Sequence, residues 1–585
     1  MSSSAASLRS GLTIALGRAA RLAARLRGGG SGGTALPGLV MEKTDPGFLR
    51  RTLDQLPLGV VVVSGTNGKT TTTKMVVELL TAQGLKVLTN RTGSNFVRGV
   101  LASLLTEVDA VGRLNHDVAV LELDEAHAVR FVRRVRPRAA LLLNVMRDQL
   151  DRFGEIDYTA SLLHKVAVAT TDAVVVNADD PRLSGPAFFK GVRARTAAFG
   201  AGSGLRSLFV SDDDLRTGSA APAETPADGA ADETAGGADV TGGGGAPADG
   251  AATTDGAPTA AAETPDAPAA PPTADAPAAD APTPADDAPA ADAPTPADDA
   301  PAADAPAADA PAPAATPRAC PAPRVVLESL QGRGAVVRVD GTDHEVSFAI
   351  PGVHNQLNAC AALALALEVL GEKADVDSLL AALARVRAAF GRGEVLTLDG
   401  RDVELSLVKN PAGFRMGLLT AEQAVAARGA ETVMIAINDE YADGRDMSWL
   451  WDVDFTCLRG EGVAVVTGVR AWDMALRLRY DEVPIGVVEP DLGKALALLR
   501  RAPDVVTGAG ANKSAGANAG AGEEAAAADG ADKSAGASAG ADKDAAAETG
   551  TAPSNRPMRV FTTYTAMLAL RARLGELTEV EEVMK

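Results

Sequence analysis

Cysteine is scarce in this chain: 585 residues contain only Cys320, Cys360 and Cys457. Three cysteines are too few for a framework of disulfide bonds, and their positions lack the spacing of metal ligands. We therefore expect the chain to work in a reducing compartment, the cytoplasm.

A field of positive charge is also missing. The formal net charge is −20, and most of it comes from one segment. Residues 221–310 contain no Lys or Arg and roughly eighteen acidic residues. The rest of the chain is close to neutral, so nucleic acid is not an expected partner. The acidity of the segment says nothing about the substrate.

The N-terminal part lacks a long apolar run. Residues 8–27 carry arginines at helical spacing, which makes them too charged for a signal peptide or a membrane-spanning helix. We predict an amphipathic helix with two alternatives. It packs on the body of the protein, or it lies on an anionic surface at the inner face of the membrane.

Two segments are of low complexity. Residues 205–323 consist mainly of Ala, Pro, Asp, Gly and Thr, and residues 508–554 are rich in Ala, Gly, Lys and Asp. Such compositions bury too little apolar surface to offset the entropy of ordering the chain. We predict that both are disordered inserts.

Residues 58–84 contain the strongest motif. A β-branched run, Val60 to Val63, precedes a glycine turn, a Lys-Thr-Thr and a helical pattern. This order is typical of a phosphate-binding loop, in which backbone N–H groups and the lysine hold phosphate and a threonine hydroxyl reaches Mg²⁺. A turn that only joins a strand to a helix is the alternative. The predicted ATP-binding residues here are Gly65, Thr66, Asn67, Gly68, Lys69, Thr70 and Thr71.

The chain around this motif alternates strand and helix patterns, which predicts an α/β fold with a mainly parallel sheet. Residues 325–350 read as antiparallel strands, and a second α/β unit follows Gly391-Arg392-Gly393. A ligand cleft between two such units is expected. Predicted strands are 59–64, 86–89, 118–123, 139–144, 173–177, 402–408, 432–437, 462–467, 485–488 and 559–562.

Polar residues stand where several strands end, and open α/β sheets bind ligands there. Glu122 is the predicted Mg²⁺ ligand, with Asp124 and Glu125 as competing choices. Asn177 suits a nucleotide or an ordinary Asx turn. Asn355 and Asn358 are three residues apart on one face of a helix, and one of them could simply cap it.

These motifs together resemble the Mur ligase family. GTNGKTT (65–71), LELDE (121–125), RDQLDRFGEID (147–157), NADDP (177–181), HNQLN (354–358) and Gly391-Arg392 occur in the family's order. LVKNPAGF (407–414) and INDEYADGRDMSWLWDVDF (437–455) are similar to its MurT branch, the ligase-like subunits of lipid II isoglutaminyl synthases.

The resemblance implies a helical leader at 1–57, an ATP-binding central domain at 58–392 and a Rossmann-like C-terminal domain at 393–585. It implies that ATP phosphorylates the α-carboxylate of D-glutamate in the stem peptide of lipid II. Ammonia from a separate GatD-type glutaminase subunit then displaces phosphate and gives D-isoglutamine.

The resemblance also implies roles for individual residues. Lys69 and the 65–71 backbone would hold the phosphates of ATP, Thr70 and Glu122 would bind Mg²⁺, and Asn177, Asn355, Asn358 and Arg392 would complete the ATP site. Asp446 would complete the Cys–His pair of the glutaminase across the subunit interface. An ion pair with Arg445 or a helix N-cap is the structural alternative for Asp446.

The chain departs from the family in two places. Only Cys320 stands in the region where MurT sequences can carry a four-cysteine zinc ribbon, so we expect no structural zinc. Leu163 stands near the place of a lysine that helps most Mur ligases hold a second Mg²⁺. Two other functions stay open: a peptide ligase that adds an amino acid to a carboxylate, and a non-catalytic nucleotide-binding scaffold for a glutaminase.

Overall fold

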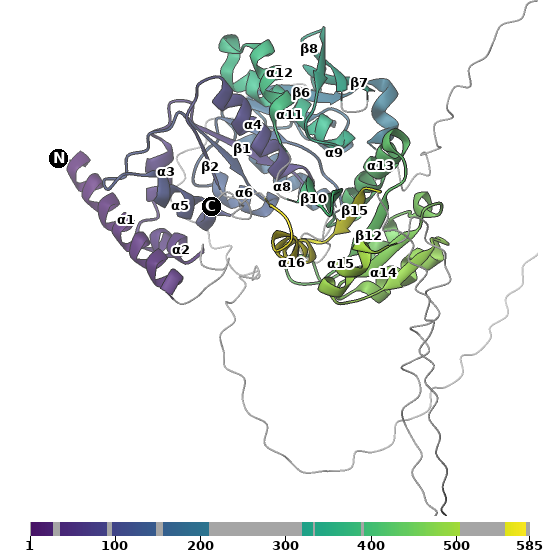
Figure 1. Cartoon of the computed structure of the whole chain (residues 1–585). Helices are drawn as coiled ribbons and strands as arrows, with labels where there is room; N and C mark the ends of the chain where they lie inside the picture. The colour runs from purple at the N-terminus through teal and green to yellow at the C-terminus, as the bar shows by residue number, and fades with distance from the viewer. Residues whose placement is uncertain are drawn as a thin grey trace, which may run out of the picture. The chain divides into compact units, whose positions relative to one another are not determined.

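The computed structural model describes residues 2–26, 35–90, 96–147, 156–209, 319–331, 334–387, 391–502 and 556–580. These residues belong to one compact unit and build two sheets with helices on both faces (Figure 1). Most of both predicted inserts lies outside the described residues. The first insert begins later than predicted, because Ser203–Leu208 forms the 3-10 helix η2.

The first sheet has nine strands in the order β2-β3-β1-β4-β5-β6-β7-β8-β9. Strands β2 to β7 pair in parallel, and β7, β8 and β9 pair antiparallel. The β-branched runs become strands buried on both faces, as parallel sheets require. The bounds are β1 Val60–Ser64, β2 Val87–Thr89, β3 Val118–Glu122, β4 Ala139–Leu142, β5 Ala173–Asn177, β6 Arg195–Ala201, β7 Val325–Gln331, β8 Gly334–Val339 and β9 Thr342–Ser347.

Helices cover both faces of this sheet and form two apolar cores. One core contains α4 (Lys69–Ala82), α11 (Val353–Leu370) and α12 (Val376–Arg385). Among the described residues α11 alone is long and apolar enough to cross a membrane, and 83% of that apolar window is buried inside the protein. The other core receives α1 Ser2–Leu26, α2 Ala35–Thr44, α3 Phe48–Leu53, α5 Val97–Glu107, α6 Glu125–Val132, α8 Ile156–Ala169 and α9 Pro181–Ser184.

The second sheet has six strands in the order β10-β11-β15-β12-β13-β14. All pairs are parallel except β10 with β11. Strand β10 was not predicted, although the Asp399-Gly400 turn with positive φ at both residues is a hairpin signal. The bounds are β10 Arg392–Leu398, β11 Arg401–Leu407, β12 Thr432–Ala436, β13 Val463–Thr467, β14 Ile485–Val488 and β15 Met558–Thr562.

Helices also cover both faces of the second sheet. The 3-10 helices η4 and η5 pack on one face together with α13 and α14, and α15 and α16 pack on the other. The bounds are α13 Pro411–Arg428, η4 Ser448–Asp452, η5 Thr456–Leu458, α14 Ala471–Tyr480, α15 Leu492–Arg500 and α16 Tyr564–Gly575.

A buried ion cluster lies inside the second sheet, and its removal should be costly. Arg559 of β15 is fully buried between Glu404 and Glu431, with its Nη1 2.7 Å from Glu404 Oε1. We expect Arg559→Ala to lower the free energy of unfolding by about 3–5 kcal/mol, because it removes the buried partner of both carboxylates. Only the more exposed Arg428 would remain, 3.1 Å from Glu431 and 3.7 Å from Glu404. Urea unfolding followed by circular dichroism would measure the change.

The matched control is Arg500→Ala, which breaks the exposed ion pair between Arg500 and Asp399. Its expected cost is below about 1 kcal/mol, because water screens exposed ion pairs. Equal losses in the two variants would contradict a special role for the buried cluster.

Candidate functional site

The turn between β1 and α4 has the conformation of a phosphate-binding loop. Its glycines adopt positive φ angles, +135° at Gly65 and +83° at Gly68, which side chains rarely tolerate. A Cβ on Gly68 would lie 2.7 Å from Asn358 Oδ1. Glycine at this position therefore allows both the turn and the close approach of α11.

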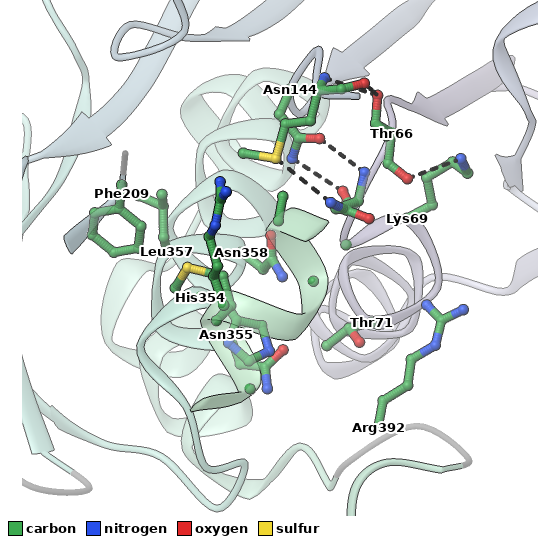
Figure 2. Close-up of a pocket in the computed structure, with 18 of the residues that line it drawn as sticks. Thr66, Lys69, Thr71, Asn144, Phe209, His354, Asn355, Leu357, Asn358 and Arg392 are labelled. Atoms are coloured by element: carbon green, nitrogen blue, oxygen red, sulfur yellow. Dashed lines mark hydrogen bonds between the residues drawn. The ribbon is translucent and has the colours of Figure 1, made fainter. Parts of the chain in front are cut away.

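The loop following β4 braces this turn (Figure 2). Asn144 Oδ1 accepts a hydrogen bond from the Asn67 N–H at 2.8 Å, and Asn144 Nδ2 donates to the Asn67 carbonyl at 3.1 Å. The Thr66 hydroxyl donates to the Met146 carbonyl and accepts from the Met146 N–H. These bonds hold the loop in shape without a ligand, so part of its ordering cost is met in advance.

Lys69 begins α4 and is buried. Its Nζ donates to the Gly65 carbonyl at 2.7 Å and lies 3.2 Å from Asp124 Oδ1 and 3.6 Å from Glu125 Oε2. The ammonium group is thus held across the turn by two carboxylates, at the positive end of the α4 dipole.

Thr70 and Glu122 form the pair of oxygen ligands that the sequence predicted for Mg²⁺. The Thr70 hydroxyl donates to Glu122 Oε1 at 2.8 Å, and both residues are buried. Asp124 and Glu125, the competing choices, face Lys69 instead. Two hard oxygen donors fit Mg²⁺, which takes few protein ligands and completes its shell with phosphate and water.

Asn90, which the sequence analysis missed, positions Glu122. Its Oδ1 accepts from the Glu122 N–H and its Nδ2 donates to the Glu122 carbonyl, both at 2.9 Å. Only the pairing of β2 with β3 brings the two residues together. Within the described ranges no group of three or more His, Cys, Asp or Glu side chains could hold a metal ion by itself.

A cavity of about 550 Å³ opens over the loop and extends to residues of the second sheet. Its size is within the range of small-molecule and nucleotide sites. Of the predicted ATP-site residues, the lining includes Thr66, Asn67, Gly68, Lys69, Thr71, Glu122, Asn177, Asn355, Asn358 and Arg392. Thr70 contacts Glu122 just behind the wall, and Gly65 contacts Lys69.

The α11 side of the cavity contains both predicted asparagines (Figure 2). Asn358 lies against Gly68, and Asn355 Nδ2 donates to the Pro351 carbonyl at 2.7 Å. Asn355 therefore also secures the start of α11. Asn177 forms the Asx turn that was its alternative, because its Oδ1 accepts from the Asp179 N–H at 3.0 Å, but it lines the cavity as well.

Arg392, the first residue of β10, lines the same cavity. Burial lowers the pKa of its guanidinium, and the charges of Glu122, Tyr564 and Asp124 act in the opposite direction. An arginine remains charged at neutral pH even when its pKa falls. It therefore supplies positive charge on the side of the cavity formed by the second sheet.

The second sheet contributes residues to this cavity that the sequence analysis did not assign to the site. Lys409 Nζ donates to the Thr66 carbonyl at 3.2 Å. Asn410 and Asn67 exchange side-chain hydrogen bonds at 3.1 and 3.4 Å. Both residues lie in the LVKNPAGF segment, where β11 ends and Asn410 caps α13. Their position directly after a predicted strand, where open α/β sheets bind ligands, is the sequence feature that could have identified them.

Asp446 lies away from the cavity and is exposed. Its Oδ1 accepts from the Ser448 N–H at 2.9 Å, and hydrogen bonds from Ser448 lower the pKa of the carboxyl group. This bond is local to the turn that leads into η4. The N-cap position of η4 is Met447 and no side chain caps it, so the helix N-cap alternative for Asp446 is wrong. Asp443 differs: it is buried and accepts from the Thr565 N–H at 2.7 Å.

His354 gives the ligand-free chain a predictable response to acid. The residue is half-buried in the wall of the cavity, its buried Nδ1 has no hydrogen-bond partner among the described residues, and loss of contact with water lowers the pKa of the imidazole from 6.5 to about 4. The imidazole of His354 is protonated more readily in the unfolded chain than in the folded one. The free energy of unfolding therefore falls as pH drops from 6.5 towards 4. The loss should reach about 2 kcal/mol at pH 5.

Urea unfolding at pH 8 and pH 5, with His354→Asn as the comparison, would measure this contribution. The variant should lose less stability than the wild type between the two pH values. Equal losses would mean that His354 titrates alike in the folded and unfolded chains.

Comparisons with known proteins agree with this geometry. Residues 63–217 match the Mur ligase middle domain, and residues 407–505 match the MurT ligase C-terminal domain. The lipid II isoglutaminyl synthase (glutamine-hydrolyzing) subunit MurT of Staphylococcus aureus (strain COL) is 25% identical over 84% of this chain and 92% of its own length. The MurT subunit of Streptococcus pneumoniae (strain ATCC BAA-255 / R6) is 27% identical over 77% of this chain and 83% of its own length.

Solved structures show the same fold. MurF from Acinetobacter baumannii aligns with a TM-score of 0.52 at 15% identity, over 92% of this chain and 81% of its own. MurF from Thermotoga maritima, solved in complex with ADP, aligns with a TM-score of 0.50 at 14% identity, over 90% of this chain and 82% of its own. The chain is therefore similar to the MurT subunits over most of its length, carries matches to the Mur ligase middle domain and to the MurT ligase C-terminal domain, and has the fold of the Mur ligases.

Proposed function

We propose that this chain is the ATP-dependent subunit of a lipid II isoglutaminyl synthase. It would amidate the α-carboxylate of D-glutamate in the lipid II stem peptide, in the cytoplasm at the inner face of the membrane. The observation that supports this most directly is the shared cavity. Lys69 of α4 and Glu122 of β3 line it together with Arg392 and Lys409 of the second sheet, and Thr70 donates to Glu122 from behind the wall.

The domain organisation belongs to the same proposal. Residues 58–392 would bind ATP, residues 393–585 would form the C-terminal domain, and residues 1–57 would be a helical leader. Lys409 and Asn410 contact the phosphate-binding loop directly, so the second sheet is in a position to present the acceptor to the nucleotide.

The chemistry brings two anions together. A carboxylate oxygen of D-glutamate attacks the γ-phosphorus of ATP, ADP leaves, and an acyl phosphate forms. Ammonia then attacks the acyl carbon, phosphate leaves, and a proton is lost to give the amide. The cations Lys69 and Arg392 lower the repulsion between carboxylate and triphosphate. Mg²⁺ held by Thr70 and Glu122 would neutralise further phosphate charge.

As in the subunits that this chain resembles, ammonia would come from a partner glutaminase of the GatD type. Because ammonia adds no side chain, the site requires no pocket for an incoming amino acid. Exposed apolar side chains beside Asp446 suit such a partner. Asp446 accepts a hydrogen bond from the N–H of Ser448, the first residue of η4, and Trp451 of η4 packs on Tyr480 of α14 with ring centroids 5.0 Å apart. Trp472 and Leu476 continue the exposed row along α14. We call Trp451, Trp472, Leu476 and Tyr480 the aromatic surface and propose that the glutaminase covers it.

The test is amidation of lipid II by the purified chain and a glutaminase subunit, with ATP, Mg²⁺ and glutamine, followed by mass spectrometry. The proposal expects amidated lipid II that depends on both subunits. If the chain hydrolyses ATP only with a free amino acid and joins it to the acceptor, it is a peptide ligase. If it supports glutamine hydrolysis without consuming ATP, it is a scaffold.

A further inference from the structure

Helix α1 contacts the rest of the protein through one face. Ile14 and Thr13 are buried, and a Cβ on Gly17 would lie 2.9 Å from the side chain of Met41 on α2. At the margins, Arg9 Nε lies 3.2 Å from Asp45 Oδ1, and Arg18 Nη2 donates to the Val108 carbonyl at 3.2 Å. The packing alternative from the sequence is therefore observed for this face.

The opposite face of α1 is apolar and exposed. Leu12, Leu22 and Leu26 expose 64%, 59% and 79% of their surface, and Leu16 exposes 39%. Leu12 and Leu16 are four residues apart, as are Leu22 and Leu26, and at 3.6 residues per turn all four lie on one side of the helix, with exposed alanines between them. We call Leu12, Leu16, Leu22 and Leu26 the leucine stripe. Figure 1 shows α1 beside α2 at the margin of the drawing.

The charges along α1 are all of one sign. Residues 2–26 contain four arginines and no acidic residue, in a chain whose net charge is −20. Helical periodicity places Arg9 on one side of the leucine stripe and Arg18 on the other, and both are exposed. An apolar stripe flanked by arginines is typical of helices that lie in the plane of a lipid surface.

We propose that the leucine stripe docks on an anionic phospholipid bilayer, with leucines among the acyl chains and arginines at the phosphates. A second copy of the chain suits this face less well, because a symmetric contact would bring the basic helices of two copies together. A bilayer matches both the apolar surface and the positive charge. Membrane docking would bring the chain to the lipid-linked acceptor. That step rests on the proposed function.

The first experiment measures binding without catalysis. The full chain is floated with vesicles of phosphatidylcholine and phosphatidylglycerol in equal parts, and with vesicles of phosphatidylcholine alone. We expect binding to the anionic vesicles, weakened by salt. The double variant Leu12→Glu/Leu22→Glu should bind at least about tenfold less, because it places carboxylates where acyl chains would lie.

The matched control is Leu498→Glu/Leu577→Glu, which adds the same charge at exposed leucines near the second sheet. It should float like the wild type, and circular dichroism should show both variants folded. Three results would overturn the proposal: no binding of the wild type, equal binding to neutral vesicles, or unchanged binding of the α1 variant. A change of oligomeric state in the α1 variant without a change in flotation would instead assign the stripe to a second copy.

A second experiment separates this inference from the proposed function. Amidation is measured with lipid II in vesicles and with lipid II in detergent micelles. The α1 variant should be slower than the control on vesicles and equal to it in micelles. If wild type and variants are all inactive in micelles, the proposed function fails while the flotation result stands.

Discussion

The Lys69→Ala variant is expected to lose amide formation from both glutamine and ammonium, by about 10²–10³-fold or more. Lys69 is the buried cation of the phosphate-binding loop, 2.7 Å from the Gly65 carbonyl and at the start of α4. Both nitrogen sources require the same acyl phosphate, so the loss must not depend on which one is supplied. Initial rates of amide formation would measure it, with nucleotide affinity determined in parallel.

Two controls make this result interpretable. Lys74→Ala removes a lysine from the same helix that does not line the cavity, and it should retain activity within about twofold. Lys69→Gln keeps a hydrogen-bond donor and reports whether Asp124 and Glu125 tolerate a neutral partner. Thermal unfolding of each variant would separate loss of function from loss of fold. Near-normal amidation by a folded Lys69→Ala chain would exclude this loop as the ATP site.

The Asp446→Asn variant is expected to fail with glutamine, by about 10²-fold or more, and to work normally with ammonium. A histidine that acts as a base needs a carboxylate to hold its tautomer, and an amide cannot replace it. Asparagine keeps an oxygen that can accept from the Ser448 N–H, so the local bond before η4 survives. The readout is the ratio of glutamine-dependent to ammonium-dependent amidation in the complex with the glutaminase.

Asp454→Asn is the matched control, because Asp454 makes the same local bond, accepting from the Thr456 N–H at 2.8 Å. It should leave both rates unchanged. Leu476→Glu on the aromatic surface should weaken the complex and reduce only glutamine-dependent amidation. If Asp446→Asn reduces amidation equally with both nitrogen sources, Asp446 supports the fold and not the glutaminase.

The sequence predicted most of the parallel strands, because buried β-branched runs and glycine turns are local signals. Strand β1 lies within one residue of its predicted bounds, 59–64, and the helical pattern predicted after the glycine turn is α4. Strand β6, with the sequence RTAAFGA, was missed because small residues give it little β propensity. The predicted disorder of residues 205–323 and 508–554 falls mostly outside the described residues and stays a prediction.

The roles of neighbouring acidic residues needed the tertiary structure. Glu122, Asp124 and Glu125 all carry a carboxylate. Strand β3 directs Glu122 to Thr70, whereas the start of α6 brings Asp124 and Glu125 to Lys69. Within a strand, successive side chains point to opposite faces, but this rule no longer holds beyond Glu122, where β3 ends. Sequence spacing therefore did not indicate where the side chains of Asp124 and Glu125 point.

By itself, the sequence indicated the class of fold, the glycine turn with its Lys-Thr-Thr and the resemblance to the Mur ligases, since each depends on residues close together in the chain. The tertiary structure decided which distant residues come together at the cavity and beside it: Asn90 reaches Glu122, and Lys409 reaches Thr66. It also decided that α1 packs through one face and leaves the leucine stripe exposed. The physical reason is that hydrogen bonds and burial depend on distances in space, which strand order and helix packing set and local sequence does not.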